Sequence, residues 1–264
     1  MGRVTVSPVG NGEVVLICGG NKCYTDIAAS FCRSTKDIDD IISNDYNKNL
    51  VKTIIESGHL AATEFDYYLF GIQGYSRVLE CQLIRKRMAS YMISSGRCEK
   101  HGKRPYNVVL PEDILDISVN VPIKDHDGLF FKVSTLDLLT MLSTWYDEGV
   151  KMGVPEEDLR YLKPQGTEMR ALIGMNAHAL MDWFNIRCCM NAQTEIRDLA
   201  NKMLKLCKQV SPDLFENAGP NCKKLGYCPE GNQNPSCRGR IITKRDAMNL
   251  IKNQNFEKAE LDVK

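Results

Sequence analysis

The segment from residue 82 to residue 97 carries the side chains of this sequence that are best suited to bind an anion. Three consecutive cations, Arg85, Lys86 and Arg87, stand beside a half-apolar run that ends on Ser-Ser-Gly-Arg at residues 94–97. Arginine forks, hydroxyl groups and a glycine that exposes its backbone N–H are the groups that bind a phosphate or a planar polar ring. The segment therefore predicts a site for one or both.

Positive charge is concentrated around this segment. Residues 75–104 hold eight Lys or Arg and two Glu, a local net charge of +6, whereas the whole chain has a net charge of +1. Basic runs are usually solvated faces, or nucleic-acid patches where the whole domain is basic. A sequence pI near 7.5 argues against nucleic acid. Met88, Tyr91 and Ile93 are untypical of a solvated face. We expect a compact anion, with a solvated face as the alternative.

Three blocks of the sequence resemble the flavin-dependent thymidylate synthases. The signature of that family reads Arg-His-Arg, then Ser, Asn, Glu, Ser, Arg and Tyr at fixed spacing. This chain matches it at Arg85, Arg87, Ser90, Ser95 and Arg97. The upstream block comprises His59, Glu64, residues 70–77 and Gln82, and the downstream block comprises residues 176–187 and 192–197. The blocks stand in the order of the family, and the similarity covers roughly residues 13–216.

The resemblance implies an enzyme, a methyltransferase that acts on dUMP. In the family reaction methylenetetrahydrofolate donates a one-carbon unit to C5 of dUMP, FAD delivers the hydride and NADPH reduces the flavin. The family also implies a homotetramer. Two alternatives stay open: a C5-hydroxymethylase or methylase of a related pyrimidine nucleotide, and a non-catalytic nucleotide-binding paralogue.

The resemblance also assigns roles to individual residues. Arg187 is the expected catalytic residue, beside the pyrimidine ring. The expected dUMP-binding residues are Gln82, Arg85, Ser95, Gly96, Arg97 and Arg160. The expected flavin- and folate-side residues are His59, Glu64, Lys86, Arg87, Asn176, His178 and Asp182.

The departures from the family pattern fall on the flavin and folate side. Lys86 replaces a histidine, Met92 and Ile93 replace asparagine and glutamate, His178 replaces an arginine and Asp182 an asparagine. Met92 and Ile93 offer no useful hydrogen-bonding group. The nucleotide half of the site is therefore the firmer expectation, and the departures keep the alternative reactions open.

Without the resemblance, several of these residues have structural interpretations. Asn176, Leu180, Trp183 and Arg187 share one helical face, with Asn176 and Arg187 roughly 16 Å apart along the axis. That pattern alone favours a core stripe with polar ends. A lone histidine such as His59 is more often a satisfied core residue.

The eleven cysteines indicate reduced thiols in the absence of a signal sequence. Cys222, Cys228 and Cys237 resemble a zinc loop, for which Cys207 is the candidate fourth ligand. Free thiols or a labile disulfide are the alternatives. The sequence contains no apolar run long enough for a membrane helix. We therefore expect a cytoplasmic protein with no membrane and no nucleic-acid partner.

The periodicity predicts an α+β fold. Residues 3–8 and 13–18 predict a hairpin around Gly10-Asn11-Gly12, and residues 65–74 and 88–94 predict strands. Helices are predicted within 21–57, 76–87, 134–152, 166–190 and 191–210. Gln82 and Arg85 are expected on one face of the second helix, and Ser134 is the expected N-cap of the third. The last helix has an expected apolar stripe of Ile196, Leu199, Met203 and Leu206. The resemblance adds a central, mostly antiparallel sheet packed with long helices. We expect one domain over residues 1–216 and a Cys/Gly/Pro-rich tail over 217–264.

Overall fold

The computed structural model of the protein describes residues 4–20, 23–95, 106–123, 128–231, 234–237 and 241–253. The chain divides into two compact units, each built from two stretches of sequence. Unit 1 comprises Met1–Cys18 and Leu69–Met175, and unit 2 comprises Gly19–Tyr68 and Asn176–Lys264. The boundary expected at residue 216 stays a prediction.

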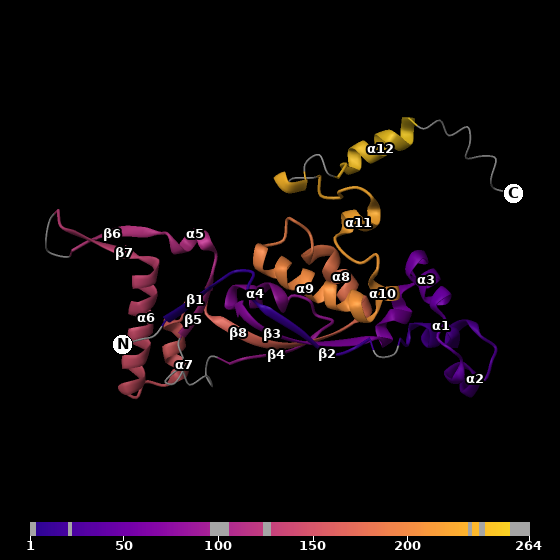
Figure 1. The fold of residues 1–264 in the computed structure, drawn as a ribbon, viewed down its shortest axis with the longest axis horizontal. Helices are drawn as coiled ribbons and strands as arrows, with labels where there is room; N and C mark the ends of the chain where they lie inside the picture. Colours follow the sequence, from indigo (N-terminus) through magenta and orange to yellow (C-terminus); the bar gives the residue numbers. More distant parts are fainter. Residues whose placement is uncertain are drawn as a thin grey trace. The chain divides into compact units, whose positions relative to one another are not determined.

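A four-stranded sheet forms the centre of unit 1 (Figure 1). Its strand order is β2 (Glu13–Cys18), β3 (Tyr67–Ser76), β8 (Glu168–Asn176) and β4 (Ser90–Ile93). The β2–β3 and β4–β8 pairs are antiparallel. Alternate side chains of β3 and β8 are buried, as expected for strands with one face in the core. The predicted α+β class with an antiparallel sheet is confirmed.

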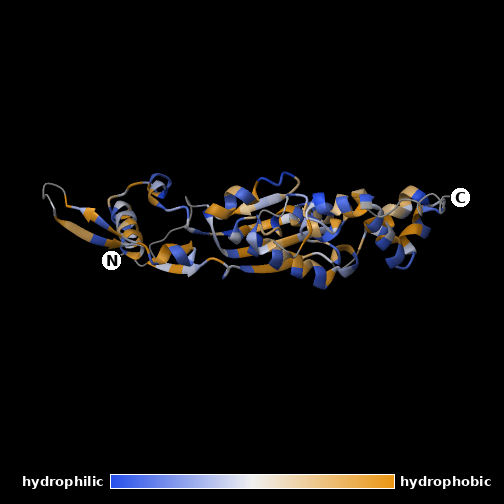
Figure 2. Cartoon of the chain, turned by 90° about the horizontal axis from the view of Figure 1, so that it is seen from above, coloured by the Kyte–Doolittle hydropathy of each residue, from blue (hydrophilic) through white to orange (hydrophobic). Residues whose placement is uncertain are grey.

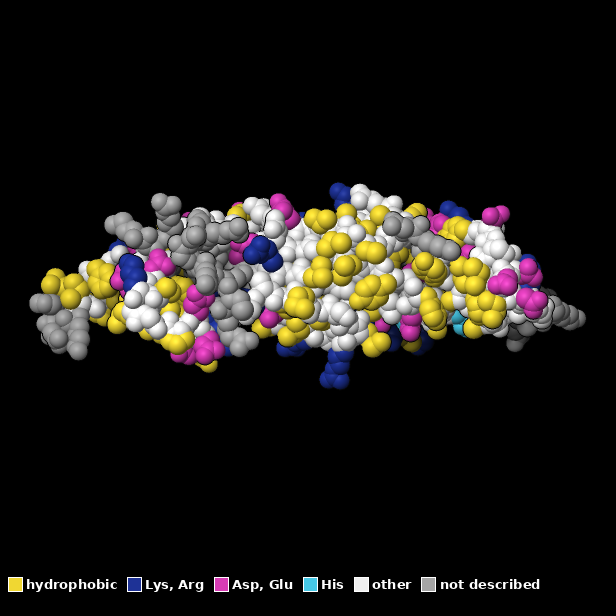
Figure 3. All heavy atoms as spheres, turned by 90° about the horizontal axis from the view of Figure 1, so that it is seen from below, with side chains coloured by type: hydrophobic (Ala, Val, Ile, Leu, Met, Phe, Trp, Pro, Cys, Tyr) yellow, Lys and Arg dark blue, Asp and Glu magenta, His cyan; other side chains and the backbone are white. Residues whose placement is uncertain are grey.

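The opposite face of this sheet is apolar and exposed. Val15 and Ile17 of β2, Met92 of β4 and Leu172 of β8 are all exposed on it. Met92 and Leu172 are directly paired across β4 and β8. Figure 3 shows hydrophobic side chains gathered over the middle of this face. We call it the outer sheet face.

The predicted N-terminal hairpin is wrong. The first strand, β1 (Val4–Pro8), pairs in parallel with β5 (Tyr106–Leu110), and β2 pairs with β3. The chain does turn between β1 and β2, and Gly10 takes the positive φ of 105° that favours glycine. Turn residues show where a chain reverses. Which strands then pair is decided by packing against parts of the chain that are distant in sequence.

The long helix predicted over residues 166–190 is also wrong in its first half. Residues 168–176 form β8, in which Met169, Ala171 and Ile173 are buried at every second position. The helix α8 then runs over Ala177–Arg187. Methionine and alanine favour helix by propensity, but pairing with β4 outweighs that preference.

The remainder of unit 1 consists of short elements around one longer helix. They are α4 (Arg77–Leu83), α5 (Glu112–Leu115), the hairpin β6 (Ser118–Pro122) and β7 (Phe130–Ser134), α6 (Thr135–Lys151), α7 (Glu156–Leu159) and η3 (Arg160–Leu162). The β6–β7 hairpin carries hydrophobic stretches on both strands (Figure 2). Helix α6 begins with the predicted cap, a capping box between Ser134 and Asp137.

Unit 2 is helical. Its elements are α1 (Thr25–Arg33), α2 (Ile38–Ser43), α3 (Lys48–Ser57), η1 (Leu60–Phe65), α8, α9 (Thr194–Val210), α10 (Pro212–Phe215), α11 (Asn221–Leu225), η4 (Pro235–Cys237) and α12 (Lys244–Asn253). The stripe predicted for α9 is largely confirmed, because Ile196, Leu199 and Met203 are fully buried. Phe215 of α10 packs edge-on against the Tyr68 ring at 5.3 Å. No helix in the described ranges is both long and apolar enough to cross a membrane.

Candidate functional site

A cationic cavity of about 480 Å³ lies within unit 1. Its lining includes Arg77 of α4, Arg160 of η3 and Lys163, which precedes β8. Glu80 is the acidic side chain among its lining residues. The volume lies in the range of small-molecule sites, and three cations against one carboxylate favour an anionic ligand. The predicted substrate residue Arg160 therefore lies in a pocket of suitable charge.

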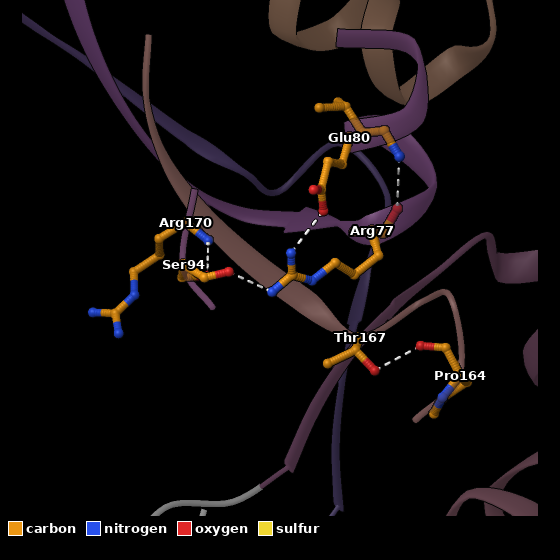
Figure 4. Close-up of polar contacts among 8 residues, drawn as sticks. Arg77, Glu80, Ser94, Pro164, Thr167 and Arg170 are labelled. Atoms are coloured by element: carbon orange, nitrogen blue, oxygen red, sulfur yellow. Dashed lines mark hydrogen bonds and ion pairs between the residues drawn. The ribbon is translucent and has the colours of Figure 1, made fainter. Parts of the chain in front are cut away.

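Arg77 connects three segments at the wall of this cavity (Figure 4). Its guanidinium donates to Glu80 Oε2 at 2.7 Å and to the carbonyl of Ser94 at 2.5 Å. Its backbone N–H donates to the carbonyl of Thr167 at 3.0 Å. The backbone N–H of Arg170 donates to Ser94 Oγ at 3.1 Å. Ser94 is therefore held from two sides at the point where β4 leads into residues 95–97.

Arg77 and Lys163 are residues of the cavity that the sequence analysis did not assign to the site. Arg77 stood at the end of the upstream block, and its charge was counted in the basic segment. The available signal was its position as the first residue of a helix that follows a strand. Lys163 gave no comparable signal, because it belongs to a loop far from that segment in sequence.

The three consecutive cations Arg85, Lys86 and Arg87, here called the signature cations, follow α4 in a turn that Tyr91 contacts. Helix α4 ends at Leu83, earlier than the predicted residue 87, so Gln82 and Arg85 do not share a helical face as expected. Arg85 Nε instead donates to the carbonyl of Cys81 at 3.3 Å. The Tyr91 hydroxyl lies 2.8 Å from the carbonyl oxygen of Leu83 and 3.0 Å from that of Lys86. These hydrogen bonds connect β4 to the turn.

The other signature residues are only partly placed. Arg87 is exposed, and Lys86 and Ser95 are half-buried. Gly96 and Arg97 lie outside the described residues. Their expected contact with a nucleotide phosphate therefore stays a prediction.

Unit 2 holds the predicted flavin- and folate-side residues other than Lys86 and Arg87, together with Arg187. His178 Nδ1 of α8 lies 3.1 Å from Glu64 Oε1 of η1, which brings two of these residues together. His59, immediately before η1, is exposed rather than buried in the core. Asp182 is exposed one turn after His178 on α8. These side chains offer polar groups to a ligand from η1 and α8.

Asn176 and Arg187 stand at the two ends of α8. The Asn176 side chain accepts the backbone N–H of Ala179 at 2.8 Å and so caps the helix. Arg187 is the last residue of the helix and is half-buried. Leu180 and Trp183 between them are buried. The middle of this stripe is therefore core, as the structural interpretation expected, while its ends are polar.

The predicted zinc ligands do not form a metal centre in the part of the chain that the structure describes. No three His, Cys, Asp or Glu side chains of that part are arranged to hold a metal ion. Cys207 is fully buried on α9, and this burial raises the pKa of its thiol.

Comparison with known proteins decides the family. Residues 19–213 match the family model described as thymidylate synthase complementing protein, Thy1. The chain belongs to this family. It is 36% identical over 183 residues to the flavin-dependent thymidylate synthase of Nitratidesulfovibrio vulgaris, covering 69% of this chain and 73% of that relative. It is 32% identical over 229 residues to the enzyme of the same name from Clostridium tetani, covering 84% and 87% of the two chains.

A solved structure has a fold similar to that of this chain. The UMP/dUMP methylase PolB from Streptomyces cacaoi, solved with 5-Br dUMP, superposes with a TM-score of 0.62. The match covers 79% of this chain and 95% of that protein at 18% sequence identity. At that identity the likeness concerns the fold alone.

We predict that Arg77→Ala lowers the free energy of unfolding by about 1–3 kcal/mol, because it leaves the Ser94 carbonyl and Glu80 without their charged donor. Arg170→Ala is the matched control, since only the backbone of Arg170 contacts Ser94 and its side chain points away (Figure 4). We expect the control to change stability by at most about 0.5 kcal/mol. Urea denaturation measures both, and equal losses would show that the guanidinium contacts contribute nothing.

Proposed function

We propose that the protein is a flavin-dependent thymidylate synthase. It methylates dUMP at C5, with methylenetetrahydrofolate as the carbon donor and FAD and NADPH as the reductants. The observation that carries the proposal is the match to the Thy1 family over residues 19–213. The relatives named flavin-dependent thymidylate synthase and the dUMP methylase of the same fold support it.

The cavity of unit 1 is the proposed phosphate end of the nucleotide site. Arg77, Arg160 and Lys163 supply three cations there, and Arg97 and the Ser95–Gly96 backbone would complete the site. The charge of a nucleotide phosphate is the same in the ground state and the transition state. These residues therefore act on binding more than on the chemical step.

Arg187 is proposed to act on the pyrimidine ring, with Gln82 and Arg85 holding the ring edges. As C5 of uracil becomes nucleophilic, negative charge develops on the ring carbonyl oxygens. A guanidinium beside such an oxygen stabilises the transition state more than the bound substrate. Arg187 is half-buried at the end of α8, so part of its side chain is shielded from water.

The polar residues of η1 and α8 fit a flavin, because they present an exposed histidine, a carboxylate–imidazole pair and a further carboxylate. We infer that His59, Glu64, Asn176, His178 and Asp182 contact FAD or folate, together with Lys86 and Arg87 of the signature turn. When bound, FAD supplies the hydride for the methyl group. Lys86 brings a fixed positive charge with three donors to a position where the family has histidine.

We further infer a homotetramer and a cytoplasmic location, in which a reducing environment keeps the cysteines as thiols. The exposed outer sheet face supports association. Val15, Ile17 and Met92 each expose more than half of their surface on it, at 60%, 56% and 73%. Exposed apolar side chains gathered on one face are typical of an interaction site.

The decisive test of the function is an assay of the product. We expect the purified protein to carry the absorbance of an oxidised flavin and to convert dUMP into dTMP in the presence of methylenetetrahydrofolate and NADPH. Mass spectrometry of the product distinguishes a methyl from a hydroxymethyl group, and UMP in place of dUMP tests the acceptor. Nucleotide binding without flavin or turnover would identify a non-catalytic paralogue instead.

Single arginine variants test the two roles within the site. We expect Arg160→Ala to raise the KM for dUMP roughly 10- to 100-fold, the loss of one charge-assisted hydrogen bond, with little change in kcat. Arg187→Ala should lower kcat roughly 10²- to 10³-fold. Arg33→Ala, an exposed arginine of α1, is the control. Tight dUMP binding by Arg160→Ala would refute the assignment of Arg160 to the phosphate. A change in KM without a change in kcat in Arg187→Ala would refute the assignment of Arg187 to the pyrimidine ring.

Substitution on the outer sheet face tests the assembly. Ile17→Lys places a charge on the apolar face at strand β2, and burying that charge unpaired between subunits is costly. We expect the parent protein to run as a tetramer in size-exclusion chromatography with light scattering, and Ile17→Lys as a smaller species. Met152→Lys is the control, because Met152 is 81% exposed after α6 and lies off this face. A parent monomer, or a tetramer in both variants, would contradict the proposed surface.

A further inference from the structure

Lys163 contacts a buried aromatic ring as well as the cationic cavity of unit 1. It is one of the residues that line the cavity, and its ammonium nitrogen lies 4.9 Å from the centroid of the Tyr146 ring. Tyr146 belongs to α6 and is only 3% exposed. The face of an aromatic ring carries partial negative charge and attracts a cation at this distance. The buried ring therefore limits where the ammonium group of this cavity residue can lie.

The same face of α6 supports the segment that carries Arg160. Gly149, three residues after Tyr146, approaches Leu159 so closely that a Cβ atom at Gly149 would overlap the Leu159 side chain. Leu159 is buried and immediately precedes Arg160, the first residue of η3. The backbone N–H of Lys163 then donates to the carbonyl of Arg160 at 3.1 Å. The close approach of α6 therefore helps to fix both cations at the cavity.

The ring holds the lysine without offsetting its charge. Arg77, by contrast, is held by the Glu80 carboxylate at 2.7 Å, and the negative charge of Glu80 offsets that of the guanidinium. With three cations and one carboxylate, the described lining of the cavity carries a net charge of +2. A phosphate monoester carries about −1.5 to −2 charges at pH 7. The positive charge of Lys163 is thus part of a set that matches one phosphate group.

We propose that Tyr146 is a positioning residue of the nucleotide site, which holds Lys163 toward the phosphate through a cation–π contact. A lysine side chain has many rotamers, and ordering them on binding costs free energy. The ring restricts these rotamers before the ligand arrives, so less ordering remains when the phosphate binds. Tyr146 lies outside the three blocks that resemble the family. The inference rests on the proposed assignment of the cavity to the nucleotide phosphate.

A series of fluorinated phenylalanines at position 146 tests the contact while the shape of the ring stays nearly constant. Fluorine withdraws electron density from the ring face and so weakens its attraction for a cation. Tyr146→Phe, which keeps the ring face, is the reference. We expect one, two and three fluorine atoms to weaken dUMP binding stepwise, by roughly 2- to 5-fold in total. Calorimetric titration of dUMP, and of inorganic phosphate, into the full chain measures the series.

Lys163→Met shows whether the ring acts through the lysine. Loss of the ammonium group should weaken dUMP binding about 10-fold, and in this background the fluorinated series should have no effect. Lys52→Met, which removes an exposed lysine of α3, is the control for a lost surface charge. Equal affinities along the series, or equal losses in both backgrounds, would overturn the role of Tyr146. Parent-like dUMP binding by Lys163→Met would overturn the contact of Lys163 with the phosphate, and the role of Tyr146 with it.

The titrations contain no folate and no NADPH, so they are read independently of methyl transfer. A protein that forms dTMP but binds dUMP without any dependence on Lys163 would contradict the inference and leave the proposed function standing. A protein that shows the dependence on Lys163 and on the fluorinated ring, but forms no dTMP, would support the inference and contradict the proposed function.

Discussion

The arrangement of the cationic cavity in unit 1 depends on one arginine at the start of a short helix. Arg77 joins α4 to the end of β4 through Ser94, and through its backbone it joins the loop before β8 at Thr167. The Glu80 carboxylate, one turn further along α4, keeps the guanidinium in place. Because the side chains of this pair are only 23% and 26% exposed, water screens the interaction less than at an open surface. The same arginine therefore shapes the cavity and contributes to its charge.

Elements with a strong local signal could be predicted from the sequence. The helix cap at Ser134 is set within one turn of α6, and the apolar stripe of α9 repeats along a single helix. Strand β3 is rich in aromatic and β-branched residues and was also predicted. In each case the information lies within about ten residues of the structure that it determines. Distant parts of the chain do not have to be known.

The errors in the pairing of β1 and in the first half of the helix predicted over 166–190 arise from distant parts of the chain. The partner of β1 is β5, about a hundred residues later, and no local pattern in residues 4–8 identifies it. Residues 168–176 have a composition that suits a helix and become a strand because β4 and β3 flank them in the sheet. Both errors arise where tertiary pairing decides between conformations of similar local preference.

The same distinction between local signals and contacts that are distant in sequence applies to the candidate site. The signature cations and the polar ends of α8 were predicted from spacing and resemblance. The sequence could not predict that one cavity joins Arg77, Arg160 and Lys163, because these residues come from three segments that are adjacent only after folding. The contact between Glu64 and His178 likewise links residues 114 positions apart, although the resemblance had named both.

The position of Met92 gives a physical meaning to one departure from the family signature. Met92 is 73% exposed on the outer sheet face and is paired with Leu172, whereas its neighbour Ile93 is half-buried on the other side of β4. Covering this exposed side chain with a second surface would contribute about 25 cal/mol of favourable free energy for each Å² of apolar surface buried. Methionine also adapts readily to irregular surfaces. An asparagine there would favour contact with a polar ligand. Methionine instead keeps this edge of the outer sheet face apolar, as Val15 and Ile17 do on the opposite edge strand β2.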